Sequence, residues 1–435
     1  MLGAWALLLG AVLLALTLAE RPLRRLPLGP AVIYLIVGWT AGASFGTPQA
    51  VTAADLQKYA AAATVVTELA VLVSLLAVGL RLRVPPTLRA WSPALLLAGP
   101  GMLVTVALGT LVAIWVLQLP WALALLLAAI MAPTDPVLAS EVQIKSDDDR
   151  DRVRVSLTAE GGLNDGSALP AVMLGLGFLG LHKLGTSGVS WLLQDVLWAI
   201  GGGLVVGLAL GRLVGALLRH RSTAGDPLLR DELLTIGLVM AAFGLAKITA
   251  TSTFVVVFAA GATLLLPFRN PAQISSESGA AGAGAGAATI APEGQQLAER
   301  LGDFGTRIER VIEAVTVLAV GWALYAIPPS WPALAFGMLL ALLVRPLAVF
   351  AVLRPHHMLP GQRRLIAWFG IRGIGTLYYL SFALEQGVAG QQALQLVQAA
   401  LTAVAVSVVL HGVSATPLMT EYQRRRAARR GGQAP

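Results

Sequence analysis

The feature that most constrains the fold of this chain is a succession of long apolar segments, most of which contain no charged residue. A helix that spans a bilayer needs about 20 apolar residues and satisfies its own backbone, because lipid offers no hydrogen-bond partner. Only 12% of the 435 residues are charged, against about 25% in a soluble domain. The sequence therefore predicts an all-α integral membrane protein with about thirteen transmembrane helices, near residues 2–19, 30–46, 60–80, 94–118, 121–140, 156–181, 189–218, 233–247, 253–268, 311–327, 331–353, 365–384 and 393–418.

The basic residues between these segments predict the orientation. Lysine and arginine concentrate in the cytoplasmic loops of membrane proteins. With an external N-terminus, the outer loops hold only Lys58, Lys183 and Lys247, and the other basic residues outside the apolar segments lie on the inner side. One span more or fewer would destroy this asymmetry. We therefore expect the chain to lie in the plasma (inner) membrane with its N-terminus outside and its C-terminus in the cytoplasm.

The composition also excludes several kinds of chemistry. Cysteine is absent, which excludes disulfides, thiolate metal sites and cysteine nucleophiles. The net charge of +8 indicates topology and attraction to anionic lipid rather than nucleic acid, because no aromatic residues interleave with the basic cluster at 424–430. No phosphate-binding G-x-x-x-x-G-K-[ST] loop is present. We expect a protein that is not an enzyme, needs no cofactor and binds no nucleic acid.

Two segments interrupt or end the predicted membrane domain at 1–420. Residues 275–296 are rich in glycine, alanine and serine, which predicts a flexible cytoplasmic linker. Residues 421–435 form a basic cytoplasmic tail. A stripe of small residues in the seventh segment predicts close helix packing, within or between subunits, at Gly203, Gly207, Gly211 and Gly215.

A few ionisable residues lie inside the apolar segments. Each costs about 2.5–3.5 kcal/mol near the bilayer centre, so each is a candidate functional residue. Four acids and two bases leave a surplus of buried negative charge, which a cation pathway needs. The six are Glu68, Asp135, Glu160, Asp165, Arg345 and Arg372.

The fifth segment contains the sequence MAPTDPVLAS, in which two prolines predict a broken helix. Unwound backbone at membrane depth lines a cavity or is buried in protein, and such breaks form ion sites. Thr134 offers an oxygen, and Asp135 can neutralise the positive end of the half-helix that follows. The alternative is an ordinary proline kink that Asp135 caps.

The sixth segment contains Glu160, Asn164 and Asp165. Burial disfavours the charged form of a carboxyl group, so a buried Asp165 can hold either a proton or a cation. This exchange is the elementary step of an antiporter. Asn164 adds an amide without adding charge.

The twelfth segment, WFGIRGIGTLYYL, predicts a second broken helix, because glycine weakens a helix by about 1 kcal/mol per residue. Its Arg372 would compensate the carbonyl end of a half-helix. In the eleventh segment Arg345 needs a buried carboxylate, and Glu160 is the natural partner.

Taken together, four of these pieces resemble the monovalent cation:proton antiporter superfamily, in its electroneutral branch of NhaP-type bacterial and animal sodium/proton exchangers. They are Thr134-Asp135-Pro136, Glu160-x-x-Leu163-Asn164-Asp165, Arg345-Pro346-Leu347 and Gly370-Ile371-Arg372-Gly373. The resemblance implies an inverted repeat in which the fifth and twelfth helices are broken and cross. It implies core transport helices at about 94–181 and 331–418, which move against scaffold helices at about 1–90 and 189–327 that form a homodimer.

The resemblance also implies roles for individual residues. Asp165 would be the site where cation and proton compete, with Asn164 and the Thr134 oxygens beside it, and Na⁺ or K⁺ would lie on Asp165 and Thr134. Glu160 and Arg345 would form a supporting ion pair. Asp135, beside the ion site, and Arg372 would balance half-helix ends, and the Asn-Asp pair implies one proton per cation.

For three further titratable residues the sequence leaves two roles open. Many bacterial members of this superfamily carry an acid near residues 77–78, where this chain is apolar. Glu68 lies two to three turns earlier and is either a ligand or a satisfied interfacial acid. His356 and His357 are either pH sensors or solvated loop residues.

The leading hypothesis is therefore exchange of Na⁺ for H⁺ by alternating access. The first alternative is K⁺/H⁺ exchange by the same mechanism. A cation channel built on the same carboxylates and a non-transporting membrane sensor are further alternatives.

Overall fold

The computed structural model describes most of the chain as helix. The described residues are 10–15, 17–18, 29–45, 51–82, 87–135, 138, 142–144, 151–220, 227–268, 292–354 and 358–431. The helices are α3 (Pro30–Phe45), α4 (Ala53–Arg81), α5 (Leu88–Leu96), η1 (Leu97–Gly101), α6 (Met102–Leu117), α7 (Trp121–Met131), α8 (Arg152–Phe178), η3 (Thr186–Gly188), η4 (Trp191–Gly202), α9 (Gly203–His220), α10 (Pro227–Thr249), α11 (Thr253–Leu264), η5 (Leu266–Phe268), α13 (Pro292–Ala326), α14 (Trp331–Leu339), η6 (Leu340–Val344), α15 (Arg345–Val352), α16 (Pro360–Trp368), α17 (Ile374–Glu385) and α18 (Gly390–Gly431).

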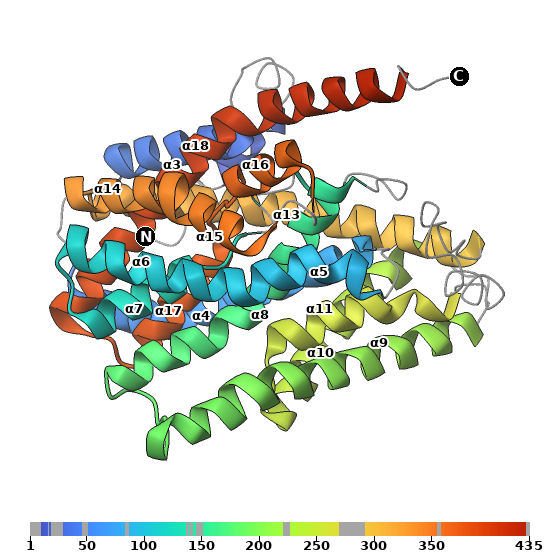
Figure 1. Ribbon diagram of the computed structural model, residues 1–435, viewed down its shortest axis with the longest axis horizontal. Helices are drawn as coiled ribbons and strands as arrows, with labels where there is room; N and C mark the ends of the chain where they lie inside the picture. Colours follow the sequence, from blue (N-terminus) through green and yellow to red (C-terminus); the bar gives the residue numbers. More distant parts are fainter. Residues whose placement is uncertain are drawn as a thin grey trace.

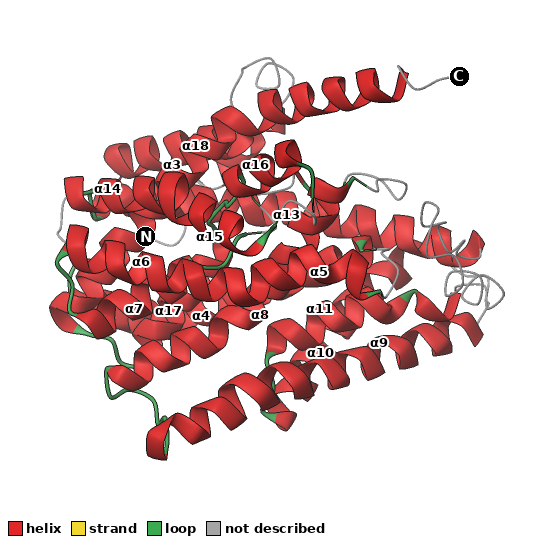
Figure 2. Ribbon diagram, in the orientation of Figure 1, coloured by secondary structure: helices red, strands yellow, loops and turns green. Residues whose placement is uncertain are grey.

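These helices form a bundle with axes close to parallel (Figure 1). Short loops join them, and no strand occurs in the described parts of the chain (Figure 2). Among the residues that the structure describes, six helical segments are long and apolar enough to cross a membrane, and three shorter ones are apolar. Many large apolar side chains on the outside of the bundle are exposed, which in a bundle of apolar helices fits a lipid-facing surface. The chain is a multi-pass membrane protein.

Helix ends follow local sequence signals. Thr52 and Asp55 form a capping box at the start of α4, in which each side chain accepts a hydrogen bond from the backbone N–H of the other. Asp151 caps α8 by accepting from Val153 N at 2.9 Å and from Arg154 N at 3.2 Å.

A helix occurs at each expected apolar segment from the second to the thirteenth. Only 10–15 and 17–18 of the first segment are described, and they are helical. The predicted linker at 275–296 lies outside the described residues as far as 291, but its last residues are not loop, because α13 begins at Pro292. The predicted tail is helical as far as Gly431, because α18 continues past residue 420 and projects beyond the bundle (Figure 1).

The early start of α13 corrects the predicted tenth span, which was placed at 311–327. Charged residues interrupt the apolar run in the first half of α13, yet Leu301, Gly305 and Glu309 are buried at a spacing of four residues, as on one face of a helix. Glu309 pairs with Arg81 of α4 at 2.5 Å, with 5% of its side chain exposed. Hydropathy does not indicate the first half of α13, because this half is rich in charged residues and its buried face carries Glu309.

The glycine stripe of α9 packs against α11 within one chain. A Cβ atom at Gly207 would collide with the backbone oxygen of Val256, one at Gly211 with that of Ala260, and one at Gly215 with that of Leu264. The small residues therefore let two helices approach at backbone distance.

We predict that Gly211→Ala lowers the stability of the protein by about 1–3 kcal/mol, because the added methyl group overpacks the contact with α11. Gly237→Ala on α10 is the matched control, since no atom lies within 4 Å of the added Cβ. The control should be neutral or stabilising, as alanine favours helix by about 1 kcal/mol. Thermal unfolding of the two variants in detergent measures the difference, and equal midpoints would contradict the packing argument.

Candidate functional site

Two interrupted helices meet inside the bundle. The first interruption follows α7, which ends at Met131 just before Pro133. The second separates α16, which ends at Trp368, from α17, which begins at Ile374. The two unwound segments are hydrogen-bonded to each other, since Asp135 N donates to Ile371 O at 2.8 Å. Backbone groups that a helix would satisfy are thus satisfied between segments far apart in the sequence.

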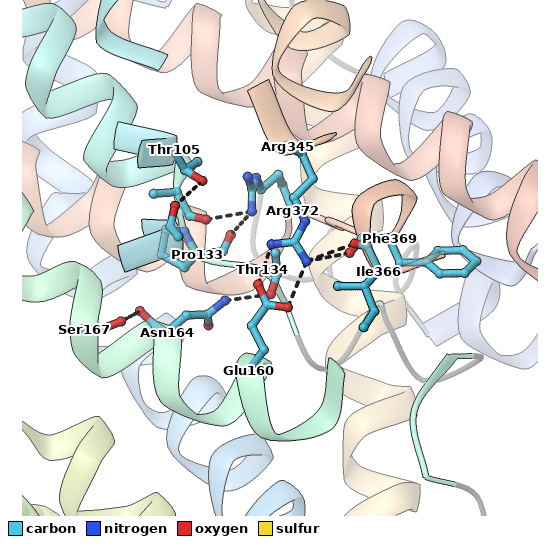
Figure 3. Close-up of polar contacts among 12 residues, drawn as sticks. Thr105, Pro133, Thr134, Glu160, Asn164, Ser167, Arg345, Ile366, Phe369 and Arg372 are labelled. Carbon is cyan, nitrogen blue, oxygen red and sulfur yellow. Dashed lines mark hydrogen bonds and ion pairs between the residues drawn. The ribbon is translucent and has the colours of Figure 1, made fainter. Parts of the chain in front are cut away.

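Each unwound segment carries a charged side chain that compensates the helix end next to the other segment. Arg372 Nη1 donates to the carbonyl oxygens of Ala132 at 2.7 Å and Pro133 at 2.8 Å, beyond the C-terminus of α7 (Figure 3). The Asp135 carboxylate accepts a hydrogen bond from Ile374 N at the N-terminus of α17. These are the ends at which a helix dipole favours a cation and an anion.

We expected Asp135 to neutralise the half-helix that follows it in sequence. Its Oδ1 accepts from Leu138 N in that following segment at 3.4 Å. Its Oδ2 accepts from Ile374 N, so the acid also serves the start of α17, far away in the sequence. Of residues 136–150 only 138 and 142–144 are described, and Pro136 lies outside them.

Glycines allow this close approach of acid and backbone. A Cβ atom at Gly373 would collide with the Asp135 carboxylate, and one at Gly375 would lie 2.6 Å from Asp165 Oδ1. The carboxylate of Asp165 therefore lies against the first turn of α17.

Asn164 and Asp165 lie on the uninterrupted helix α8 and are each 1% exposed. Asn164 Nδ2 donates to Thr134 Oγ1 at 2.6 Å, so the three residues expected to form the site come from α8 and the first unwound segment (Figure 3). The backbone carbonyl of Asp165 accepts from the Tyr379 hydroxyl group. Both Asp165 carboxylate oxygens and Asn164 Oδ1 lack a hydrogen-bond partner among the described residues.

Glu160 and Arg345 lie beside this group as a bidentate ion pair. Arg345 Nη1 lies 2.5 Å from Glu160 Oε1, and Nη2 lies 2.8 Å from Oε2. Nη2 also donates to the carbonyl oxygens of Ile366 at 3.2 Å and Phe369 at 3.1 Å. The pair therefore joins α8 and α15 to the end of α16, and its guanidinium satisfies carbonyls that the break leaves free.

Glu68 contacts a different part of the bundle. Its Oε1 accepts from Lys247 Nζ at 3.1 Å and from Thr253 Oγ1 at 3.1 Å. No contact with Asp165, Asn164 or Thr134 is found for it in the described structure. This placement matches the satisfied acid that was the alternative for Glu68.

Three contacting residues were not identified from the sequence: Ser407 and His411 contact the second interrupted region, and Tyr379 contacts Asp165. Ser407 Oγ accepts from Arg372 N at 2.9 Å, and His411 Nε2 lies 2.9 Å from Trp368 O. One signal was available: an imidazole within an apolar segment is as unusual as a carboxylate there. His356 and His357 lie outside the described residues.

The fold and the site define a multi-pass membrane protein with a buried polar site at two interrupted helices. The model of the family described as "Sodium/hydrogen exchanger, transmembrane" matches residues 9–421. The chain belongs to this family.

Several known proteins are similar over nearly the whole chain. The K(+)/H(+) antiporter NhaP2 of Shewanella sp. (strain MR-4) is 28% identical over 94% of this chain and 65% of its own length. The K(+)/H(+) antiporter NhaP of Alkalimonas amylolytica is 26% identical over 89% of this chain and 61% of its own. This chain thus spans slightly less than two thirds of these curated relatives.

A solved structure shows the same fold. The sodium proton antiporter MjNhaP1 from Methanocaldococcus jannaschii matches with a TM-score of 0.69 and 18% identity, over 97% of this chain and 98% of the other.

We predict that Arg345→Ala destabilises the protein by about 3–5 kcal/mol, because Glu160 is left buried without its partner. The double variant Glu160→Gln/Arg345→Leu should lose less, since no unpaired charge remains. Arg425→Ala is the control, because its pair with Glu421 is exposed and such pairs contribute at most about 1 kcal/mol. Thermal unfolding in detergent compares the three, and an Arg345→Ala midpoint equal to that of the wild type would contradict the structural role of the pair.

Proposed function

We propose that this protein exchanges a monovalent cation for a proton across the membrane, with Asp165 as the group on which the two compete. The observation that carries this proposal is the state of the Asp165 carboxyl group. It is buried, and neither oxygen has a hydrogen-bond partner in the described structure. A buried carboxyl group without a partner is stable when it holds a proton or a cation.

Each transport cycle then balances in charge. Protonated Asp165 releases H⁺ as the cation binds its carboxylate, and on the other side of the membrane a proton replaces the cation. Asn164 Oδ1, which also lacks a partner in the described residues, is placed to be a further ligand, while the Thr134 hydroxyl positions the Asn164 amide and offers its oxygen to the same site. The oxygen donors of this group suit a hard alkali cation.

The neighbouring charges support an electroneutral cycle. Glu160 is paired with Arg345, Arg372 lies on carbonyl oxygens and Asp135 lies on a helix N-terminus. Asp165 is then the one carboxylate of this cluster whose charge is free to change. One proton exchanges for one cation.

We further propose K⁺ as the cation. Sequence motifs alone favoured Na⁺, but two relatives that align with nearly the whole chain are named K(+)/H(+) antiporters. Ion preference depends on cavity size and ligand number, which the motifs leave open.

The transport movement is proposed to follow the family pattern. The thirteen spans form an inverted repeat whose fifth and twelfth members, containing α7 and α16–α17, cross at the site. The core helices α5–α8 and α14–α18 move against a scaffold of α3, α4 and α9–α13, and the scaffold forms a homodimer. The N-terminus is external, the C-terminus is cytoplasmic and the location is the plasma (inner) membrane.

A channel is less well supported, because conduction requires a continuous wet path, whereas Asp165, Asn164 and Glu160 are each at most 2% exposed. A non-transporting sensor would not need a buried carboxylate without a partner.

We predict that Asp165→Asn abolishes exchange and leaves the fold intact, because the amide keeps the shape but cannot exchange a proton. Proteoliposomes that contain a pH dye report internal pH after addition of KCl, NaCl or LiCl. Wild type and the exposed-acid control Asp303→Asn should move protons with the salt, most strongly with KCl. Salt-driven proton movement that persists in Asp165→Asn would reject the assignment.

We also predict that the exchange rate is independent of membrane potential, because no net charge crosses in a 1:1 cycle. The measurement imposes inside-negative and inside-positive diffusion potentials at a fixed pH gradient. A rate that rises with one sign of the potential would reject the 1:1 stoichiometry while leaving exchange itself in place.

A further inference from the structure

Two side chains of α18 satisfy the backbone at both ends of the unwound segment 369–373. At its far end, Arg372 N donates to Ser407 Oγ at 2.9 Å. At its near end, His411 Nε2 lies 2.9 Å from the carbonyl oxygen of Trp368, the last residue of α16. Ser407 and His411 are four residues apart and therefore lie on one face of α18.

The imidazole of His411 also contacts Ser407. Because Trp368 O only accepts, Nε2 donates to it. Nδ1 lies 3.2 Å from Ser407 Oγ and 2.8 Å from Ser407 O. Arg372 N, Ser407, His411 and Trp368 O therefore form one continuous set of polar contacts.

The imidazole is enclosed on all sides, since His411 is 3% exposed. The rings of Trp368 and Phe369 lie 6.1 Å and 6.4 Å from it.

Ser407 and His411 hold the unwound segment 369–373, and the geometry of the site depends on this segment. Arg372 compensates the end of α7, and α17, which begins directly after the segment, receives Asp135 and lies against Asp165. A displacement of 369–373 by a few tenths of an ångström would move all three contacts.

We propose that Ser407 and His411 are positioning residues of the exchange reaction, which hold the unwound segment 369–373 in the geometry that exchange needs. This inference rests on the proposed function. Neither residue contacts the Asp165 carboxylate in the described structure, so the effect acts through the unwound segment.

The first test compares exchange rates in proteoliposomes per folded protein. Ser407→Ala and His411→Leu should lower the maximal rate by about tenfold, the equivalent of one lost buried hydrogen bond, with a smaller change in the half-saturating cation concentration. Ser407→Thr and His411→Gln, which keep a hydroxyl group and a donor to Trp368 O, should restore it. Ser414→Ala is the control, because its hydroxyl group contacts the Trp368 side chain and Leu410 O rather than the backbone of the unwound segment. Rates in Ser407→Ala and His411→Leu equal to wild type would overturn the proposal.

Amide hydrogen exchange separates this proposal from the proposed function. In Ser407→Ala the Arg372 amide should exchange at least about tenfold faster, because its acceptor is gone, whether or not the protein transports. Unchanged protection there would overturn the inference even with intact antiport. If the Arg372 amide exchanges faster in Ser407→Ala than in wild type, but wild type itself moves no protons, the proposed function alone is rejected.

Discussion

The site depends on an exchange of charges between two interrupted helices. Arg372 lies at the C-terminal end of α7, and Asp135 lies at the N-terminal end of α17. Each charge is buried, and each is stabilised by backbone groups that the other interruption exposes. Removing either one would leave the helix end that it contacts without its compensating charge. The two interruptions therefore stabilise each other, and neither would be tolerated alone at this depth.

The remaining polar contacts extend this principle to the neighbouring helices. Arg345 pairs with Glu160 of α8 and also binds carbonyl oxygens at the end of α16. Ser407 and His411 of α18 hold the second interruption from another side. Charges and free backbone groups are compensated throughout this cluster, with the Asp165 carboxylate as the exception in the described structure. That exception is what gives the site a chemical function in our proposal.

The contacts between α8 and α11 are apolar rather than ionic. Cβ atoms at Gly162 and Gly166 of α8 would collide with the side chains of Phe258 and Val255 of α11. The two apolar side chains fill the space that the glycines leave, whereas the contacts of α8 with α15 and the first unwound segment are ionic or hydrogen-bonded. The helix that carries Asp165 is thus joined to one set of neighbours by polar contacts and to α11 by apolar packing.

The sequence by itself determined the helical class, the multi-pass architecture and the residues worth examining, because lipid leaves the backbone few alternatives and makes each buried charge costly. It also located both helix breaks, since prolines and glycines act locally. It did not show that α13 begins well before the apolar run at 311–327, because the buried Glu309 lies within a charged stretch and pairs with Arg81 of a distant helix. It could not determine which helix end Asp135 serves, that Glu68 belongs with Lys247, or that Ser407 and His411 hold the second break. Those are contacts between residues far apart in the chain, and only tertiary structure decides them, because a buried polar group is satisfied by whichever partner the packing of the helices brings within hydrogen-bond distance.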